Sequence, residues 1–450
     1  MGAGAEKAMA NNFGMRPGSE PPERAGAGLQ RGAEYTGRYV VLLDRADPER
    51  GMNALRSAAG VAAVERVRGA EPESAVAMLA RPNASVLFDE LAVAVVDAQP
   101  DQRHALVTTA EAEPTIIAAE PERVVYATVI TEARQAVTGF FPAYRSDERA
   151  LQRFTQSQMA AQMGPAWDET TTTWGIQAIR ANLSGQTGRG VKVAVLDTGV
   201  DTDHPDLTGC LEETASFVEG QTVEDGKGHG THCIGTVAGP ARPAQGPRYG
   251  VANEARVLAG KVLNNAGRGT DGQILAGIAW AVSHGARVIS MSFGSPVARG
   301  ELFSQTYENV AQRALDAGVL LVAAAGNESQ RPGDVEAVDS PANCPSIIAV
   351  AAVDRALATA WFSCGALNGQ GGEINIAGPG VDVLSAVPNG GLGLKSGTSM
   401  ATPHVAGTLA LIAQAHPEAS AADLRNLLLS GASPLSQGAD EVGAGLLQAP

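Results

Sequence analysis

The chain has few of the residue types that most often indicate binding to nucleic acids or membranes. Aromatic residues make up 4% of the 450 residues and charged residues 18%. No stretch is rich in lysine and arginine, and the formal net charge is -15, which argues against binding to phosphate backbones. The same charge disfavours an anionic membrane surface. We therefore expect neither nucleic acid nor membrane among the partners.

Long apolar runs are also absent from the sequence. None approaches the length that spans a bilayer, and the first residues lack the apolar core of a secretion signal. The compartment therefore stays open. Cysteine is scarce, and no C-x-x-C occurs, so the cysteines predict no metal site. The four that exist allow three full pairings; they are Cys210, Cys233, Cys344 and Cys364.

Composition and hydrophobic pattern divide the chain into four predicted regions. Residues 1–36 are rich in Gly, Ala, Pro and charge, which is typical of a disordered leader. Residues 37–127 alternate apolar strands with helices in a β-α-β-α-β order, which predicts a small α+β domain. Residues 128–170 are polar without a sustained period and are interpreted as a linker. The predicted strands of the small domain are 39–43, 85–98 (one strand or two) and 115–127, and its predicted helices are 49–59 and 100–112.

Residues 171–450 have a different pattern, in which continuous apolar strands alternate with helical stretches. The strands include "VKVAVLD", "ARVLAGKVL", "ARVISMSFG", "GVLLVAAAGN" and "SIIAVAAVD". This order predicts an α/β fold with a doubly wound parallel sheet that helices cover on both faces. Active sites of such sheets lie at the carboxyl ends of the strands.

Polar residues stand at several of these junctions. Asp197 ends the first strand, and His229 opens a helix after a Gly-rich approach. Asn327 follows another strand, and Ser399 lies in the first turn of the apolar helix in "SGTSMATPHVAG". Taken singly, each has a structural explanation as a turn residue, a helix cap or a structural histidine. A metal site at "HGTH" lacks a third nearby ligand, so no metal site is predicted.

Together the four residues have a chemical meaning. A serine hydroxyl is a poor nucleophile until a base removes its proton, and a histidine can do so near neutral pH. An ionised aspartate holds the imidazole in the right tautomer. The side-chain amide of Asn327 and the backbone N–H of Ser399 can stabilise the oxyanion. The small residues around Ser399 would let a peptide carbonyl approach.

At this point the sequence resembles the subtilases, the subtilisin-like serine proteases. The resemblance covers about residues 174–450 and rests on "VAVLDTGVDTDHPDL", "GHGTHCIGTVAG", "SFG", "AAAGNES" and "SGTSMATPHVAG". It implies a triad of Asp197, His229 and Ser399, with Asn327 in the oxyanion hole, acting through an acyl-enzyme. It also implies a seven-stranded parallel sheet. "HGTHC" is most similar to the proteinase K branch, which implies that Cys233 is a buried free thiol.

The resemblance further implies how a protein or peptide substrate binds. Two edge segments would hold an extended peptide by strand addition. The implied substrate-binding residues are Ser292, Phe293, Gly294, Gly267, Arg268, Gly269, Ala325 and Gly326. The loop after Asn327 should help to form the specificity pocket. It carries Glu328, Asp334, Glu336 and Asp339, which either favour a basic residue before the cleaved bond or form a solvated face.

Other implications concern cofactors and the front region. No cofactor is expected for catalysis. A structural calcium ion is possible in the family, but Asp206 has lost its usual partner loop and Asn375 replaces an acid, so strong calcium dependence is not expected. Residues 37–127 resemble a prodomain, of ferredoxin-like fold, that inhibits until removed. The maturation site would lie between about Ala127 and Thr173.

The leading hypothesis is therefore a monomeric serine endopeptidase made as a self-inhibited zymogen. A dedicated processing protease with one client is an alternative. A non-catalytic peptide-binding module is another, although no triad member or oxyanion donor is missing.

Overall fold

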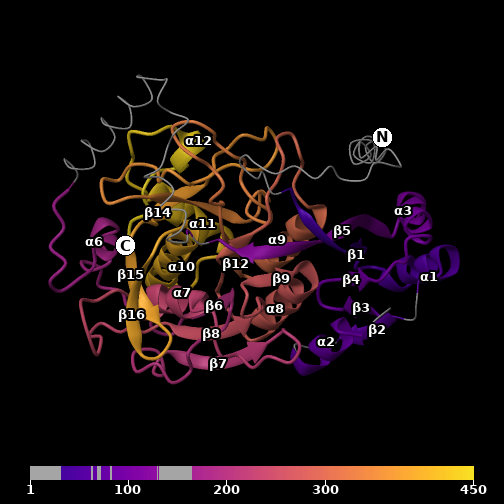
Figure 1. Ribbon diagram of the computed structural model, residues 1–450, viewed down its shortest axis with the longest axis horizontal. Helices are drawn as coiled ribbons and strands as arrows, with labels where there is room; N and C mark the ends of the chain where they lie inside the picture. Colours follow the sequence, from indigo (N-terminus) through magenta and orange to yellow (C-terminus); the bar gives the residue numbers. More distant parts are fainter. Residues whose placement is uncertain (1–31, 62–63, 68–71, 82–83, 129, 131–164) are drawn as a thin grey trace, which may run out of the picture. The chain divides into compact units, whose positions relative to one another are not determined.

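The larger part of the molecule is built on a sheet of seven parallel strands (Figure 1). The computed structural model describes residues 32–61, 64–67, 72–81, 84–128, 130 and 165–450. In chain order the sheet strands are β6 (Lys192–Asp197), β7 (Leu211–Ser216), β8 (Arg256–Lys261), β10 (Val288–Met291), β12 (Leu320–Ala324), β13 (Ile348–Val353) and β14 (Ile376–Pro379). They lie in the order β14-β13-β12-β10-β6-β8-β7. The inner strands are buried on both faces, which explains their continuous apolar runs.

Helices cover both faces of this sheet. They are α6 (Trp174–Ala178), α7 (His229–Ala238), α8 (Asp271–Ser283), α9 (Gln305–Asp316), α10 (Thr398–Ala415), α11 (Ala421–Ser430) and α12 (Ala439–Val442). Neighbouring residues of β6 point to opposite faces. Asp197 contacts α7, whereas Leu196 lies against Gly277 of α8. The predicted doubly wound α/β fold is therefore confirmed.

Residues 34–127 form a smaller α+β arrangement. Its elements are β1 (Glu34–Leu43), α1 (Pro48–Ala59), β2 (Val64–Val67), α2 (Pro72–Leu79), β3 (Ser85–Phe88), β4 (Val93–Val96), α3 (Arg103–Ala112) and β5 (Ile116–Ala127). The sheet order is β5-β1-β4-β3-β2. Without β2 and α2 this is the β-α-β-β-α-β order of a ferredoxin-like fold, as predicted.

Strand β2 and helix α2 are absent from the sequence-based prediction. Among the described residues β2 pairs with β3 alone, at the edge of the sheet, and its Glu65 and Arg66 form ion pairs with Arg81 and Glu49. Its "VERV" therefore lacks the apolar run that marks a central strand. α2 has eight residues, too few to show a helical period clearly. The single predicted segment 85–98 contains two strands, β3 and β4, which pair as an antiparallel hairpin.

Two predicted regions fall largely outside the described residues: residues 1–31 of the expected leader and residues 131–164 of the expected linker. β1 begins at Glu34, whereas the small domain was expected to begin at residue 37.

Strand β5 pairs with more than its own domain. Beyond β1, it pairs antiparallel with β9 (Arg268–Thr270) and β11 (Phe293–Gly294), so the sheet of the small domain gains two strands from the larger part. A separate two-stranded sheet consists of β15 (Val383–Val387) and β16 (Gly391–Lys395). The main-chain continuity through β5 fixes where residues 127 and 128 lie.

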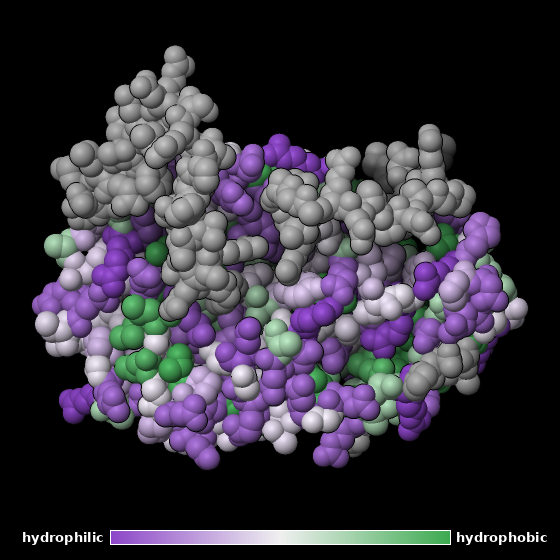
Figure 2. Space-filling view, viewed as in Figure 1, coloured by the Kyte–Doolittle hydropathy of each residue, from purple (hydrophilic) through white to green (hydrophobic). Residues whose placement is uncertain are grey.

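The surface agrees with the composition. Figure 2 shows that hydrophilic residues predominate among the coloured atoms of one face, with small separate apolar areas. Among the described residues, no helix is long and apolar enough to cross a membrane.

Leu196 offers a test of the packing between β6 and α8. It is fully buried, so Leu196→Ala should lower the free energy of unfolding by about 3 kcal/mol through lost burial and a residual cavity. The measurement is denaturant unfolding, with Ser399→Ala present in every chain that is compared. The matched variant Leu302→Ala, at a side chain 46% exposed, should change stability by less than about 0.5 kcal/mol. Equal losses in the two variants would contradict this packing.

Candidate active site

The site is assembled around a buried Asp197–His229 pair. Asp197 ends β6, and His229 opens α7. The imidazole Nδ1–H donates to Asp197 Oδ1 at 2.7 Å, because an ionised carboxylate can only accept. Asp197 Oδ1 also accepts from the backbone N–H of Thr198 at 2.7 Å. The other ring nitrogen, His229 Nε2, has no hydrogen-bond partner among the described residues. That nitrogen is therefore available to take a proton.

The loop before His229 is held by Asp225, a residue that the sequence analysis missed. Asp225 Oδ1 accepts from the backbone N–H of Gly228 at 2.7 Å and from Thr198 Oγ1 at 2.7 Å. Its Oδ2 accepts from both the backbone and the hydroxyl of Thr231 at 2.8 Å. Asp225 thus ties the start of α7 to the end of β6. The "D-G-K-G" turn ahead of the helix was the available signal.

Ser399 lies in the first turn of α10, as predicted, and is completely buried. Its hydroxyl donates to the carbonyl of Thr128 and contacts the carbonyl of Ser292 at 3.0 Å and the hydroxyl of Thr128 at 2.6 Å. The carbonyl of Ser399 accepts from Ser292 Oγ at 2.9 Å. A segment of the chain's own front region therefore already occupies the position next to the serine.

Asn327 and Ser399 meet at the same carbonyl. Asn327 Nδ2 donates to the carbonyl oxygen of Thr128 at 2.7 Å. The amide is held in this orientation because Asn327 Oδ1 accepts from the backbone and hydroxyl of Thr398 at 2.9 and 3.0 Å. A donor fixed in this way suits an oxyanion that develops on the carbonyl oxygen.

The remaining predicted positions line the path of β5. Ala127 N donates to the carbonyl of Gly267 at 2.9 Å, and Val125 and Tyr126 pair with Gly269 and Arg268. On the other side, Phe293 and Gly294 of β11 pair with Ala127 and Tyr126. Thr128 N contacts the carbonyl of Ser292 at 3.5 Å. Ala325 and Gly326 precede Asn327, where β12 ends.

The cysteines are free and buried. Cys233 Sγ lies 4.0 Å from His229 Nδ1 and 3.6 Å from the carbonyl of Ser399. Burial raises the pKa of the Cys233 thiol well above its ordinary value, so it stays protonated. A protonated thiol is a poor metal ligand, although its sulfur lies near Asp197 and His229.

Two positions discussed for calcium have other partners. Asp206 Oδ1 accepts from the backbone N–H of Ala244 at 2.7 Å, and Oδ2 accepts from Tyr249 OH at 2.8 Å. Asn375 Oδ1 accepts from the backbone N–H of Ala349 at 2.7 Å. Each of these oxygens therefore already accepts a hydrogen bond within the protein.

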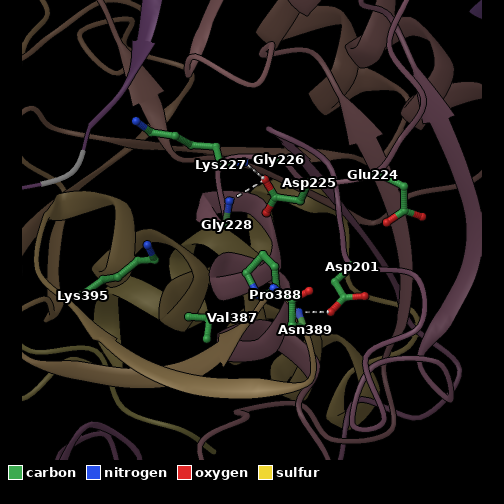
Figure 3. Close-up of a pocket in the computed structure, with 10 residues that line it drawn as sticks. All are labelled: Asp201, Glu224, Asp225, Gly226, Lys227, Gly228, Val387, Pro388, Asn389 and Lys395. Atoms are coloured by element: carbon green, nitrogen blue, oxygen red, sulfur yellow. Dashed lines mark hydrogen bonds between the residues drawn. The ribbon is translucent and has the colours of Figure 1, made fainter.

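A hollow of about 560 Å³ opens beside the start of α7 (Figure 3). Its lining includes Asp201, Asp225 and Lys227 from one part of the chain and Asn389 and Lys395 from another. Figure 3 shows Asp201 and Asp225 turned to backbone N–H groups of Asn389 and Gly228. These two acids are therefore already hydrogen-bonded within the protein.

Comparison with known proteins agrees with this geometry. The model of the Subtilase family matches residues 188–445. Subtilisin of Bacillus pumilus is 42% identical over 267 residues, which cover 58% of this chain and 92% of the relative. Subtilisin E of Bacillus subtilis (strain 168) is also 42% identical over 267 residues, or 66% of its length. Subtilisin Savinase of Lederbergia lenta is 41% identical over 280 residues, or 96% of its length. The chain belongs to the subtilase family and is a subtilisin-like serine endopeptidase.

Proposed function

We propose that the chain is the self-inhibited precursor of this endopeptidase and that it cleaves itself between Thr128 and Val129. In this proposal Asp197, His229 and Ser399 are the catalytic residues, and Asn327 supplies an oxyanion donor. The region of residues 37–127 is the inhibitory domain, and residues 171–450 are the peptidase domain. Protein or peptide chains are the substrates.

The contacts of the Thr128 carbonyl carry this proposal. It receives hydrogen bonds from Ser399 Oγ and Asn327 Nδ2, the two groups expected around a carbonyl under attack. The chain is also held beyond the next residue, because Ile130 N donates to the carbonyl of Ser396 at 2.9 Å. Both sides of the Thr128–Val129 bond are thus bound as a substrate would be.

The interface of the small domain supports an intramolecular inhibitor. Glu120 accepts from Ser304 Oγ at 2.6 Å and from the backbone N–H of Gln305 at 2.8 Å, at the start of α9. Glu122 accepts from the backbone N–H of Gly272 at 3.0 Å, at the start of α8. Carboxylates are favoured at helix N-termini, where free N–H groups and the helix dipole meet. These contacts would hold the domain in place after cleavage.

The reaction follows from the arrangement of these groups. Ser399 Oγ attacks the carbonyl carbon while His229 Nε2 takes its proton. Asp197 stabilises the imidazolium, and Asn327 Nδ2 stabilises the oxyanion. The tetrahedral intermediate collapses when the C–N bond breaks, and the leaving amine takes its proton from His229. Water then hydrolyses the acyl-enzyme by the same route, with His229 as base.

The purified wild-type chain should convert into a fragment of residues 129–450, with Val129 as the new N-terminus. Intact mass spectrometry over time measures this conversion. Ser399→Ala should stay whole, because loss of the nucleophile typically lowers turnover about a million-fold. A first cleavage at another bond would contradict the assignment of Thr128, and cleavage of the Ser399→Ala chain would contradict self-processing.

Asn327→Leu should lower kcat of the processed enzyme about a hundredfold to a thousandfold, because one oxyanion donor is worth about 3 kcal/mol. KM should change little, since the donor acts mainly in the transition state. Steady-state kinetics on a peptide substrate measures both constants. The control is Asn426→Leu on the exposed face of α11, which should leave both unchanged. A loss confined to KM would argue against the oxyanion role.

Binding of the cleaved small domain should weaken as pH rises towards 7. Asp271 is buried beside β5, where it accepts from the backbone N–H of Arg123 at 2.7 Å and from Tyr307 OH at 2.8 Å. Burial, with a contribution from Glu122, raises the pKa of Asp271 from 3.8 to about 7. A carboxyl with a raised pKa in the complex takes up a proton on binding. Association is therefore favoured at low pH and loses this contribution as pH rises through about 7.

Gel filtration of the cleaved mixture at several pH values tests this expectation. Affinity should fall roughly tenfold between about pH 5.5 and pH 7 and then level off. Asp271→Asn should remove most of this dependence. A wild-type complex that tightens with rising pH would contradict the argument.

Several narrower expectations stay predictions. The position of Cys233 under His229 supports the proteinase K-like branch. The hydrogen bonds of Asp206 support the expectation of no strong calcium dependence. The expectation of a monomer and the expected range of protein substrates rest on the family resemblance. Cleavage of a denatured protein mixture would separate a broad protease, with many cut sites, from a dedicated processor.

A further inference from the structure

One buried carboxylate near the site has no role in the reaction described above. Asp339 is 1% exposed; its Oδ2 accepts no hydrogen bond from an N–H or hydroxyl group of the described residues, and its carboxyl group is hydrogen-bonded to that of Glu328. Glu328 lies beside it, and the two carboxylates lie within 4.8 Å of each other and of Cys364 Sγ. Glu328 and Asp339 are referred to below as the acid pair. Two neighbouring carboxyl groups repel each other when both are ionised, so the acid pair requires an explanation.

The acid pair lies between the two segments that hold Thr128. A Cβ on Gly294 would lie 2.7 Å from Asp339 Oδ2, and a Cβ on Gly326 would lie 2.8 Å from both Asp339 Cγ and Glu328 Oε2. Gly294 belongs to β11, whose neighbour Ser292 contacts Thr128 N. Gly326 adjoins Asn327, which binds the Thr128 carbonyl.

Backbone hydrogen bonds also connect the segment that carries Asp339 to the segments of Gly294 and Gly326. Asp339 N donates to the carbonyl of Ala325 at 2.9 Å, and Ser295 N donates to the carbonyl of Ser340 at 2.9 Å. The segment that carries Asp339 therefore lies between the segment of Gly294 and the segment of Gly326. The acid pair therefore lies next to the backbone that holds Thr128, the residue before the proposed cleaved bond.

Thr128 does not neutralise the charge of the acid pair. Its hydroxyl contacts Ser399 Oγ at 2.6 Å, and its short side chain carries no charge. Burial and the neighbouring Glu328 raise the pKa of Asp339 well above its ordinary value. A cation with several N–H donors would favour the ionised form of Asp339 and could donate hydrogen bonds to both side chains of the acid pair.

We propose that the mature enzyme prefers arginine or lysine as the residue before the cleaved bond, and that Asp339 and Glu328 recognise its cationic end. This inference rests on the proposed function of the site. It narrows four acidic candidates of the loop to two, since Asp334 is exposed and Glu336 does not belong to the group of side chains formed by Glu328, Asp339 and Cys364. The bond after Thr128 is then an exception, cleaved because the small domain holds it in place.

A metal ion is a less suitable ligand for the acid pair than a cationic side chain. Cys364 Sγ–H contacts Glu328 Oε2 at 3.5 Å as a donor. Burial raises the pKa of the Cys364 thiol well above its ordinary value, so the thiolate that a metal would require is disfavoured. The same oxygen, Glu328 Oε2, also accepts a hydrogen bond from the backbone N–H of Asn327 at 2.6 Å.

The test uses the self-processed enzyme and four peptide substrates that differ only in the residue before the cleaved bond: arginine, lysine, leucine or threonine. We expect kcat/KM for arginine and lysine to exceed that for leucine at least about tenfold, as for a charge-assisted contact in a buried pocket. Asp339→Asn and Glu328→Gln should each lower the arginine-to-leucine ratio about tenfold or more. The leucine substrate shows whether each variant is folded and active.

Asp334→Asn is the matched control, because it removes the same charge from an exposed position of the same loop and should leave the ratio unchanged. A wild-type preference for leucine or threonine, or a ratio that Asp339→Asn does not change, would overturn the proposal. A ratio that falls equally in Asp334→Asn, or that changes when EDTA is added, would overturn it as well. If no peptide is cleaved at all, the proposed function itself fails, and this inference fails with it.

Discussion

The account depends on the antiparallel pairing of β5 with β9 and β11. This pairing uses only main-chain groups, so it holds whatever side chains β5 carries. It delivers the carbonyl of Thr128 to Ser399 Oγ and Asn327 Nδ2. The same geometry would explain both substrate binding and the proposed self-inhibition, because the segment ending at Thr128 and a substrate would use the same backbone positions.

The fold explains why the proposed catalytic groups can be rigid. Asp197, His229, Asn327 and Ser399 come from four separate elements, yet each lies at the carboxyl edge of the parallel sheet or at the start of a helix beside it. Each is then fixed by a neighbour, as Asp225 fixes the loop before His229 and Thr398 fixes the amide of Asn327. Burial of all four excludes water and strengthens these contacts.

The sequence predicted the central sheet, and it predicted that the four candidate site residues lie at strand ends and helix starts, because both have local signals. Apolar runs mark the strands, and a polar residue directly after such a run marks the active edge. Asp225 and Thr128 have no comparable signal, since their roles arise from contacts with Thr198 and with Ser399 far along the chain. β2 was not predicted because this edge strand is only partly buried and carries charged residues in place of an apolar run. The acid pair could be suspected from the loop charges, but only the fold shows which acids are buried.

The central claim is that the segment ending at Thr128 occupies the catalytic centre until the chain is cut. A fluorophosphonate probe that reacts with activated serines tests it, with the labelled residue mapped by mass spectrometry during self-processing. The account predicts a label on Ser399 of the fragment 129–450 and none on the intact chain or on Ser399→Ala. Equal labelling of Ser399 in the intact chain would contradict self-inhibition, and a label on another serine would contradict the catalytic assignment.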